Sequence, residues 1–188
     1  MNETIQSILK RRSIRAYKQI QISENELQVI LTAGSYAPTA MGQQPWHFIV
    51  LQNPELLDRL QVRSREMFAL SGIPALEEMA SDDRFNVFYE APTLVIVSAD
   101  KGAIAPVQDS VLAMENMMIA ATSLGIGSCW VHSVMWLYEK GGGAEIFSEL
   151  GVPLREGFAP YAAAVFGYSA QTWPEAGPRK PGMVSIVR

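Results

Sequence analysis

The chain has 188 residues, of which 48% are hydrophobic and 18% charged, and its formal net charge at pH 7 is −4. This length suffices for a core that buries about 70% of the surface of the unfolded chain, and we expect residues 1–188 to form a single domain. The negative charge argues against general nucleic-acid binding, which requires a broadly basic face. The surplus of apolar residues is a weak indication of a subunit interface.

The cysteine content and the N-terminal sequence bear on where the protein works. Cys129 is the only cysteine, so an intrachain disulfide is excluded and an oxidising compartment is not implied. The N-terminal segment carries an acid at Glu3 and lacks the long apolar stretch of a signal peptide. The longest apolar runs, around 94–99 and 161–166, have the length of strands and fall far short of a bilayer span. We therefore expect a cytoplasmic protein that does not bind membranes.

Hydrophobic periodicity and capping signals predict the elements of the N-terminal half. Ser23 and Glu26 form a capping box that opens a helix, and Pro54 suits the first turn of a later one. Residues 71–86 combine Gly, Pro, acids and methionines without clean periodicity, and we interpret them as a mobile helical or loop insertion. The predicted elements are helices over 4–10, from 24 to about 34–38 and from about 53 onward, with a strand over 47–51.

The C-terminal half begins with an almost fully apolar run over 93–97, which is typical of a strand buried on both faces. The segment 109–124 is apolar around most of a helical surface, so it belongs in a core or an interface, and Gly125 ends it as a C′ glycine would. Prolines make the tail over about 169–188 extended, and its last residues alternate like a strand. Further predicted elements are strands over 128–133 and 158–167 and a short helix over 144–150.

Helices and strands interleave along the chain without regular βαβ spacing. This order favours an α+β sandwich, with a mixed central β-sheet flanked by helices, over a doubly wound fold. No repeat and no long linker divides the chain.

Basic residues gather between 10 and 18 of this otherwise acidic chain. The run Arg11-Arg12-Ser13-Ile14-Arg15 offers three guanidiniums and a hydroxyl, which is enough positive charge and hydrogen-bond donation to hold a phosphate. The alternative is a solvated turn whose cations complement the C-terminal end of a helix. A second basic pair, Arg179-Lys180, could converge on the same phosphate. The cluster therefore indicates a small anionic ligand rather than a polymer.

The segment Gly125-Ile126-Gly127-Ser128 lies between the predicted 109–124 helix and a strand. It is not a dinucleotide fingerprint, because the third glycine and the strand-turn-helix order are missing. One interpretation is a helix stop. The other is that its glycines let the backbone approach a planar ring and donate N–H groups to it.

Other chemically active residues do not assemble into a site. Cys129, His47 and His132 cannot form a persuasive zinc site, and strand geometry puts 129 and 132 on opposite faces, so we expect no metal. Cys129 is interpreted as a buried structural cysteine. The four tryptophans either stack on a ligand or simply pack; they are Trp46, Trp130, Trp136 and Trp173.

Four segments together resemble the FMN-dependent nitroreductase-like family, in the order found there and over roughly the whole chain. They are Arg11 to Arg15, Ala37-Pro38-Thr39 with Gln44-Pro45-Trp46, Phe88-Tyr89-Glu90-Ala91-Pro92, and Leu124 to Ser128. The resemblance implies a three-layer α+β sandwich in an intertwined homodimer, whose C-terminal strand often joins the sheet of the partner.

The resemblance also implies a set of FMN-binding residues. Arg11, Ser13, Arg179 and Lys180 would bind the phosphate, Arg12 would lie near the phosphate or ribityl end, and Arg15 near N1 and O2. The turn formed by Gly125, Ile126, Gly127 and Ser128 would donate to N5 and O4. Pro38, Thr39, Ala40 and Gln44 would reach the flavin of the other subunit, with backbone groups serving at Ala40 and Gly42, where many relatives carry Ser or Asn.

The implied function is that of an FMN-dependent oxidoreductase, which transfers hydride from NAD(P)H via flavin N5 to small organic acceptors such as nitroaromatics or quinones. Because the chain holds no dedicated nicotinamide domain, reductant and acceptor would share one pocket in turn, with ping-pong kinetics. No side chain is assigned as catalytic, and solvent would supply protons.

Two alternatives stay open at this point. The first is another flavin reaction, such as dehalogenation, enone reduction or dehydrogenation, since one fold and cofactor serve many functions. The second is a flavin-binding or storage protein with little turnover.

Overall fold

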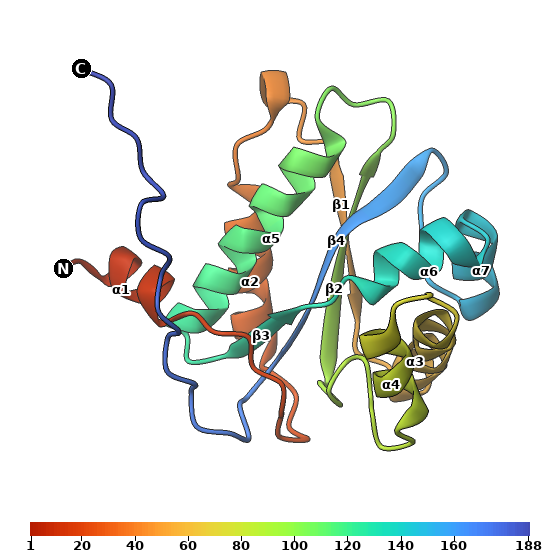
Figure 1. The fold of residues 1–188 in the computed structure, drawn as a ribbon. Coiled ribbons are helices and arrows are strands. Elements are labelled where there is room, and N and C mark those ends of the chain that lie inside the picture. Colours follow the sequence, from red (N-terminus) through yellow and green to blue (C-terminus); the bar gives the residue numbers. More distant parts are fainter.

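The computed structural model describes residues 1–188, and a four-stranded sheet with helices on both faces forms its centre (Figure 1). The strands are β1 (Trp46–Leu51), β2 (Thr93–Asp100), β3 (Gly127–Trp130) and β4 (Phe158–Gly167), in the spatial order β1-β2-β4-β3. Every ladder between them is antiparallel. The one parallel pairing is an isolated bridge between Ser13 and Ser128. A mixed sheet was expected, but the four strands form a purely antiparallel one. Apolar patterning predicts where a strand lies, but it does not predict the direction of the neighbouring strand.

The helices form the outer two layers of a three-layer α+β sandwich. They are α1 (Glu3–Lys10), α2 (Glu24–Ser35), the 3₁₀ turn η1 (Ala40–Gly42), α3 (Pro54–Ala69), α4 (Pro74–Ser81), α5 (Pro106–Ser123), α6 (Ser133–Gly141) and α7 (Ala144–Leu150). In Figure 1, α2 and α5 cover one face of the sheet, and α3, α4, α6 and α7 lie on the other.

Strand β2 shows why the sheet needs both layers. Its side chains from Thr93 to Ala99 are all buried. Leu94 and Ile96 join the apolar cluster on the face of α3, α6 and α7, whereas Val95 and Val97 join the cluster on the face of α2 and α5. Successive residues of a strand point to opposite faces, so a continuous apolar run requires cover on both sides. This confirms the prediction for 93–97.

Local chemistry fixes the helix starts that the sequence predicted. Ser23 accepts from the backbone N–H of Glu26, and the Glu26 carboxylate accepts from the backbone N–H of Ser23 at 2.8 Å, which completes the capping box of α2. The side chain of Asn53 accepts from the N–H of Leu56 at 3.0 Å and caps α3. None of the helices has the length and apolarity that crossing a bilayer requires.

Residues 71–86, which were predicted as a helical or loop insertion, contain one defined helix, α4. Two other segments differ from the sequence-based prediction. The strand expected over 128–133 ends at Trp130, and a helix that the sequence did not predict, α6, begins at Ser133. The terminal strand is not formed within one chain: Met183, Val184, Ile186 and Val187 are 70–97% exposed, because a strand needs a neighbour to pair with.

Candidate functional site

The basic segment and the glycine turn, which are far apart in the sequence, are in direct contact. The Ile14 N–H donates to the Ser128 carbonyl at 3.0 Å, and Ser13 bridges to Ser128. Ile14 is fully buried. A Cβ added to Gly127 would lie 3.0 Å from three side-chain carbons of Ile14, so only glycine lets β3 approach so closely. Residues 11–15 are therefore held against the end of β3.

The three arginines of this segment have different surroundings. The Arg11 Nε lies 3.6 Å from the Glu115 carboxylate on α5, in an exposed pair. Arg12 is occupied by carbonyls, since it donates to Leu9 at 2.7 Å and, by Nε, to Pro174 at 3.2 Å. Arg15 is exposed and lies over the Tyr89 ring, with its Cζ 5.8 Å from the centroid. Arg11 and Arg15 are thus the cations best placed to meet an anion, and Arg12 ties the tail to α1.

The start of the C-terminal tail lies along the basic segment. The Ala170 N–H donates to the Ala16 carbonyl at 2.9 Å, and the Arg15 N–H donates to the Gln171 side chain at 3.2 Å. Lys10 lies over the Trp173 ring at 5.7 Å. Beyond this anchor the tail runs past α1 and away from the body of the protein (Figure 1). The predicted phosphate ligands Arg179 and Lys180 lie on this exposed part, and Arg179 donates only to the Gly177 carbonyl.

The turn after α5 is first of all a helix stop. Gly125 has φ +76°, its N–H donates to the Thr122 carbonyl at 3.1 Å, and the Ile126 N–H donates to the Ala121 carbonyl at 2.8 Å. This is the Schellman arrangement, which satisfies the last carbonyls of a helix. The predicted backbone donors at Gly125 and Ile126 are therefore already occupied by α5. Gly127 and Ser128 instead hold the basic segment.

The loop that holds Pro38, Thr39, Ala40 and Gln44 lies at the other end of α5. The Ala40 N–H donates to the buried Asp109 carboxylate near the start of α5 at 3.1 Å, and the Gln44 N–H donates to the Thr39 hydroxyl at 3.2 Å. Arg11 meets α5 at Glu115, six residues after Asp109, which corresponds to about 9 Å along the helix axis. No hydrogen bond or ion pair joins this loop to residues 11–15 of the same chain.

One cavity adjoins the basic segment, and a second is next to it and shares Phe85 and Tyr89 with it. One, of about 280 Å³, is lined by Arg15, Arg84 and Asn86 among others. The other, of about 300 Å³, is mostly apolar and extends beneath α4 to the start of α6. A larger depression of about 720 Å³ shares Asn86 and Glu90 with the Arg15 cavity but has no cationic residue in its lining. The two smaller cavities together give a polar end and an apolar end on either side of Tyr89.

Tyr89 is held in this position by a strained backbone. Tyr89 and Glu90 have φ values of +56° and +55°, which are uncommon for residues other than glycine and cost about 1–3 kcal/mol each. The Glu90 carbonyl is fixed by the Gln19 side chain, which donates to it at 3.0 Å. Burial raises the pKa of the Tyr89 hydroxyl, and the Arg15 guanidinium opposes that rise. The hydroxyl therefore stays protonated at neutral pH, as a hydrogen-bond donor beside Arg15.

Cys129 lies next to this group but has the character of a core residue. It is 2% exposed, and burial raises the pKa of its thiol against the opposing effect of Arg15. A protonated thiol is neither a nucleophile nor a metal ligand. The structure therefore agrees with a structural cysteine.

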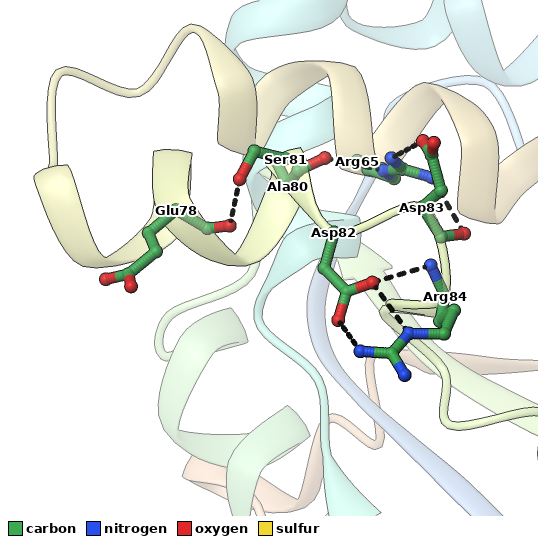
Figure 2. A network of polar contacts seen from close by, with 7 residues as sticks. All are labelled: Arg65, Glu78, Ala80, Ser81, Asp82, Asp83 and Arg84. Carbon is green, nitrogen blue, oxygen red and sulfur yellow. Dashed lines mark hydrogen bonds and ion pairs between the residues drawn. The ribbon is translucent and has the colours of Figure 1, made fainter.

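Helix α4 is fixed at its C-terminal end by Arg65 of α3. Arg65 donates from Nε to the Ala80 carbonyl at 2.8 Å and from Nη2 to the Asp83 carboxylate at 2.8 Å. In the same turn, the Arg84 guanidinium meets both oxygens of Asp82, at 3.1 and 3.2 Å (Figure 2). Arg84 is thus largely neutralised by Asp82, while Arg65 holds α4 over the apolar cavity.

Part of this site was not predicted from the sequence. No role was assigned to Tyr89 within the segment Phe88 to Pro92, and residues 130–133 were expected in a strand and not in the lining of a cavity. Ser133 was the available sequence signal for the start of α6, since a serine followed by apolar residues is typical of a helix start. No local signal shows that α4 covers the same space.

Comparisons with known proteins agree on one family. The model of the nitroreductase family matches residues 8–168. A nitroreductase from Bacteroides fragilis, solved with bound FMN, is 36% identical over the full length of both chains, with a TM-score of 0.88. A protein of Archaeoglobus fulgidus, named provisionally as an NADH dehydrogenase/NAD(P)H nitroreductase, is 36% identical over 70% of this chain and 68% of its own. An iodotyrosine deiodinase from Thermotoga neapolitana is 28% identical over 63% of this chain and 68% of its own.

Proposed function

This chain belongs to the nitroreductase family, and we propose that it is a single-domain FMN-dependent oxidoreductase that transfers hydride from NAD(P)H to small organic acceptors. The observation that carries this proposal is the contact of Ile14 with Gly127 and Ser128, which holds the segment with Arg11 and Arg15 in place, and Arg15 lines a cavity. When bound, FMN would supply the hydride chemistry, and the protein would hold and orient it.

The residues present fit FMN. Arg11 and Ser13 would bind the phosphate, because a guanidinium and a hydroxyl are suited to phosphate oxygens. Arg15, held by Tyr89, would lie near N1 and O2, where negative charge develops on reduction. Arg12 would act through the tail that it anchors. Arg179 and Lys180 would complete the phosphate site once the exposed tail is ordered.

We further propose a homodimer in which each flavin contacts both subunits. Within one chain no hydrogen bond or ion pair joins the loop with Pro38, Thr39, Ala40 and Gln44 to residues 11–15, and a second copy would bring this loop to the same flavin. Exposed apolar side chains on α5 support this: Val107, Val111 and Leu112 are 38–46% exposed. Twofold association is also the commonest form of oligomer.

The dimer can be tested with one charge on α5. Leu112→Glu should dissociate the protein to monomers in light scattering at micromolar concentration, because a charge is strongly disfavoured in the centre of an interface. Val62→Glu on α3 is the matched control, since Val62 and Leu112 are both 44% exposed. A wild-type protein that stays monomeric while it holds FMN would refute the shared site.

Ping-pong kinetics follow from the single site proposed here. NAD(P)H would have to leave before the acceptor could occupy its place, so double-reciprocal plots at several fixed acceptor concentrations should be parallel. Intersecting lines would mean that both substrates bind at once, and would contradict a pocket used in turn.

An anaerobic titration distinguishes an enzyme from a carrier. The purified protein should be yellow with one FMN per subunit, and NADH or NADPH should bleach it within seconds. A panel that contains a nitroaromatic, a quinone and a halogenated phenol should then restore the colour at different rates. Rapid reoxidation by the halogenated phenol alone would favour dehalogenation, in line with the deiodinase relative. Flavin that NAD(P)H does not reduce would indicate storage.

A further inference from the structure

The turn that carries Tyr89 is rigid although its backbone is strained. Tyr89 and Glu90 both lie in the left-handed region, which glycine adopts without strain. The Tyr89 N–H donates to the Asn86 carbonyl at 2.9 Å, and the Phe88 N–H donates to the Asn86 side chain at 2.8 Å. The Gln19 side chain holds the Glu90 carbonyl at 3.0 Å. Strain that the surroundings fix in this way is concentrated at functional sites, so the side chain of Tyr89 needs an explanation.

The side chain of Tyr89 meets the guanidinium of Arg15. The Arg15 Cζ lies 5.8 Å from the centroid of the Tyr89 ring, and a hydrogen bond to the Tyr89 hydroxyl raises the pKa of Arg15. No carboxylate forms an ion pair with Arg15. Tyr89 is therefore the side chain that sets the direction of this exposed guanidinium.

The second arginine of the same cavity is held differently. Arg84 also lines the cavity, but both of its bonds go to the Asp82 carboxylate. The Arg15 guanidinium carries no such counter-charge. A guanidinium is planar and donates in a fixed fork, so its orientation decides which ligand atoms it can reach. A free arginine side chain would also lose more conformational freedom on binding a ligand than one that is already held in place.

We propose that Tyr89 is a positioning residue, which holds Arg15 in the orientation that stabilises reduced FMN and thereby raises the reduction potential of the bound cofactor. This inference rests on the proposed function. Reduction increases the negative charge near N1 and O2, so an aligned guanidinium stabilises the reduced cofactor more than the oxidised one. Tyr89 itself transfers no proton and acts through Arg15.

Tyr89→Phe tests this inference, because it keeps the ring and removes the hydroxyl. The midpoint potential of bound FMN is measured by anaerobic equilibration with a reference dye, and the affinity for oxidised FMN by fluorescence titration of the apoprotein. Reduced FMN should bind about 2- to 10-fold more weakly relative to oxidised FMN, as expected for loss of one hydrogen bond. This ratio corresponds to a fall of about 10–30 mV for a two-electron couple. The affinity for oxidised FMN should stay close to that of the wild type.

A double-mutant cycle shows whether Tyr89 acts through Arg15. Arg15→Gln alone should lower the potential more than Tyr89→Phe does, and adding Tyr89→Phe to it should cause no further change. Tyr168→Phe is the matched control, because Tyr168 is also partly exposed and its hydroxyl donates to the Glu26 carboxylate at 2.7 Å. This control should leave the potential unchanged.

Three results would overturn the inference. Equal weakening of oxidised and reduced FMN in Tyr89→Phe would make Tyr89 a structural or general binding residue. A potential that does not change in Tyr89→Phe would mean that the hydroxyl does not align Arg15. Additive effects of Tyr89→Phe and Arg15→Gln would show that Tyr89 acts on the flavin directly.

The proposed function is tested separately on the same samples. The reference dye and dithionite reduce the flavin without NAD(P)H, so the potential is measured even if NAD(P)H is not the reductant. Flavin that dithionite reduces and NAD(P)H does not would refute the proposed function and leave the role of Tyr89 measurable. Wild-type protein that holds no FMN would refute both.

Discussion

Replacing Gly127 with valine is expected to abolish FMN retention. The added Cβ would lie 3.0 Å from three carbons of Ile14, and neither residue can yield, because Ile14 is fully buried and its N–H is bound to Ser128. The valine would therefore push residues 11–15 away from β3 and displace Arg11 and Arg15 together. Loss of two charge-assisted contacts should weaken FMN more than about 100-fold, as measured by fluorescence titration of the apoprotein.

The same substitution should also lower thermal stability. Overpacking a buried site costs about 1–3 kcal/mol, and a protein of this size loses about 2–4 °C of Tm per kcal/mol. Ile14→Ala in the same chain removes two of the three carbons that the valine would meet and leaves Cβ, so the double variant should regain part of the FMN affinity. If the double variant regains no FMN affinity, the close contact with Ile14 does not explain the need for glycine at position 127. Gly127 would then act on the ligand directly.

Arg11→Ala is expected to weaken FMN binding about 10- to 150-fold, which corresponds to one charge-assisted hydrogen bond of about 1.5–3 kcal/mol. The competing pair with Glu115 is exposed, with side chains 30% and 46% accessible, so releasing it costs little. The rate of flavin reduction in the FMN-saturated variant should stay near that of the wild type, because Arg11 would contact the phosphate and not the reacting ring.

Arg63→Ala is the matched control for Arg11→Ala. Arg63 is also half-exposed and pairs with a glutamate, Glu66, at 2.7 Å, but it lies on α3. Both variants remove one surface charge, so only a local contact with the phosphate can explain a difference in FMN affinity between them. Equal FMN affinity in the two variants would show that residues 11–15 are merely a basic surface.

Elements with local signals were predictable from the sequence. The capping box at Ser23, the Asn53-Pro54 start and the glycine after α5 each use hydrogen bonds within a few residues of one another. Helix α6 was missed because only His132 and Ser133 separate the apolar residues of β3 and Val131 from Val134 and Met135. Such a run fits a strand or a buried helix equally well.

The candidate site was predictable in its parts but not in its assembly. The sequence indicated a basic segment and a glycine turn, yet their contact depends on Ile14 meeting Ser128, which no local pattern encodes. The turn was expected to donate to a flavin, whereas Gly125 and Ile126 already serve α5. The apolar cavity draws on α3, α4, the Tyr89 turn and α6, so it exists only in the folded chain.

The proposed flavin site between two protomers has a consequence for how the protein matures. Each protomer has complete apolar clusters on both faces of its own sheet, so folding can be unimolecular. A site shared between protomers forms only after two folded chains meet, and capture of the flavin is then second order in protein. A newly made chain would pass through a folded, colourless monomer, and dilution below the dissociation constant of the dimer would release flavin together with the partner.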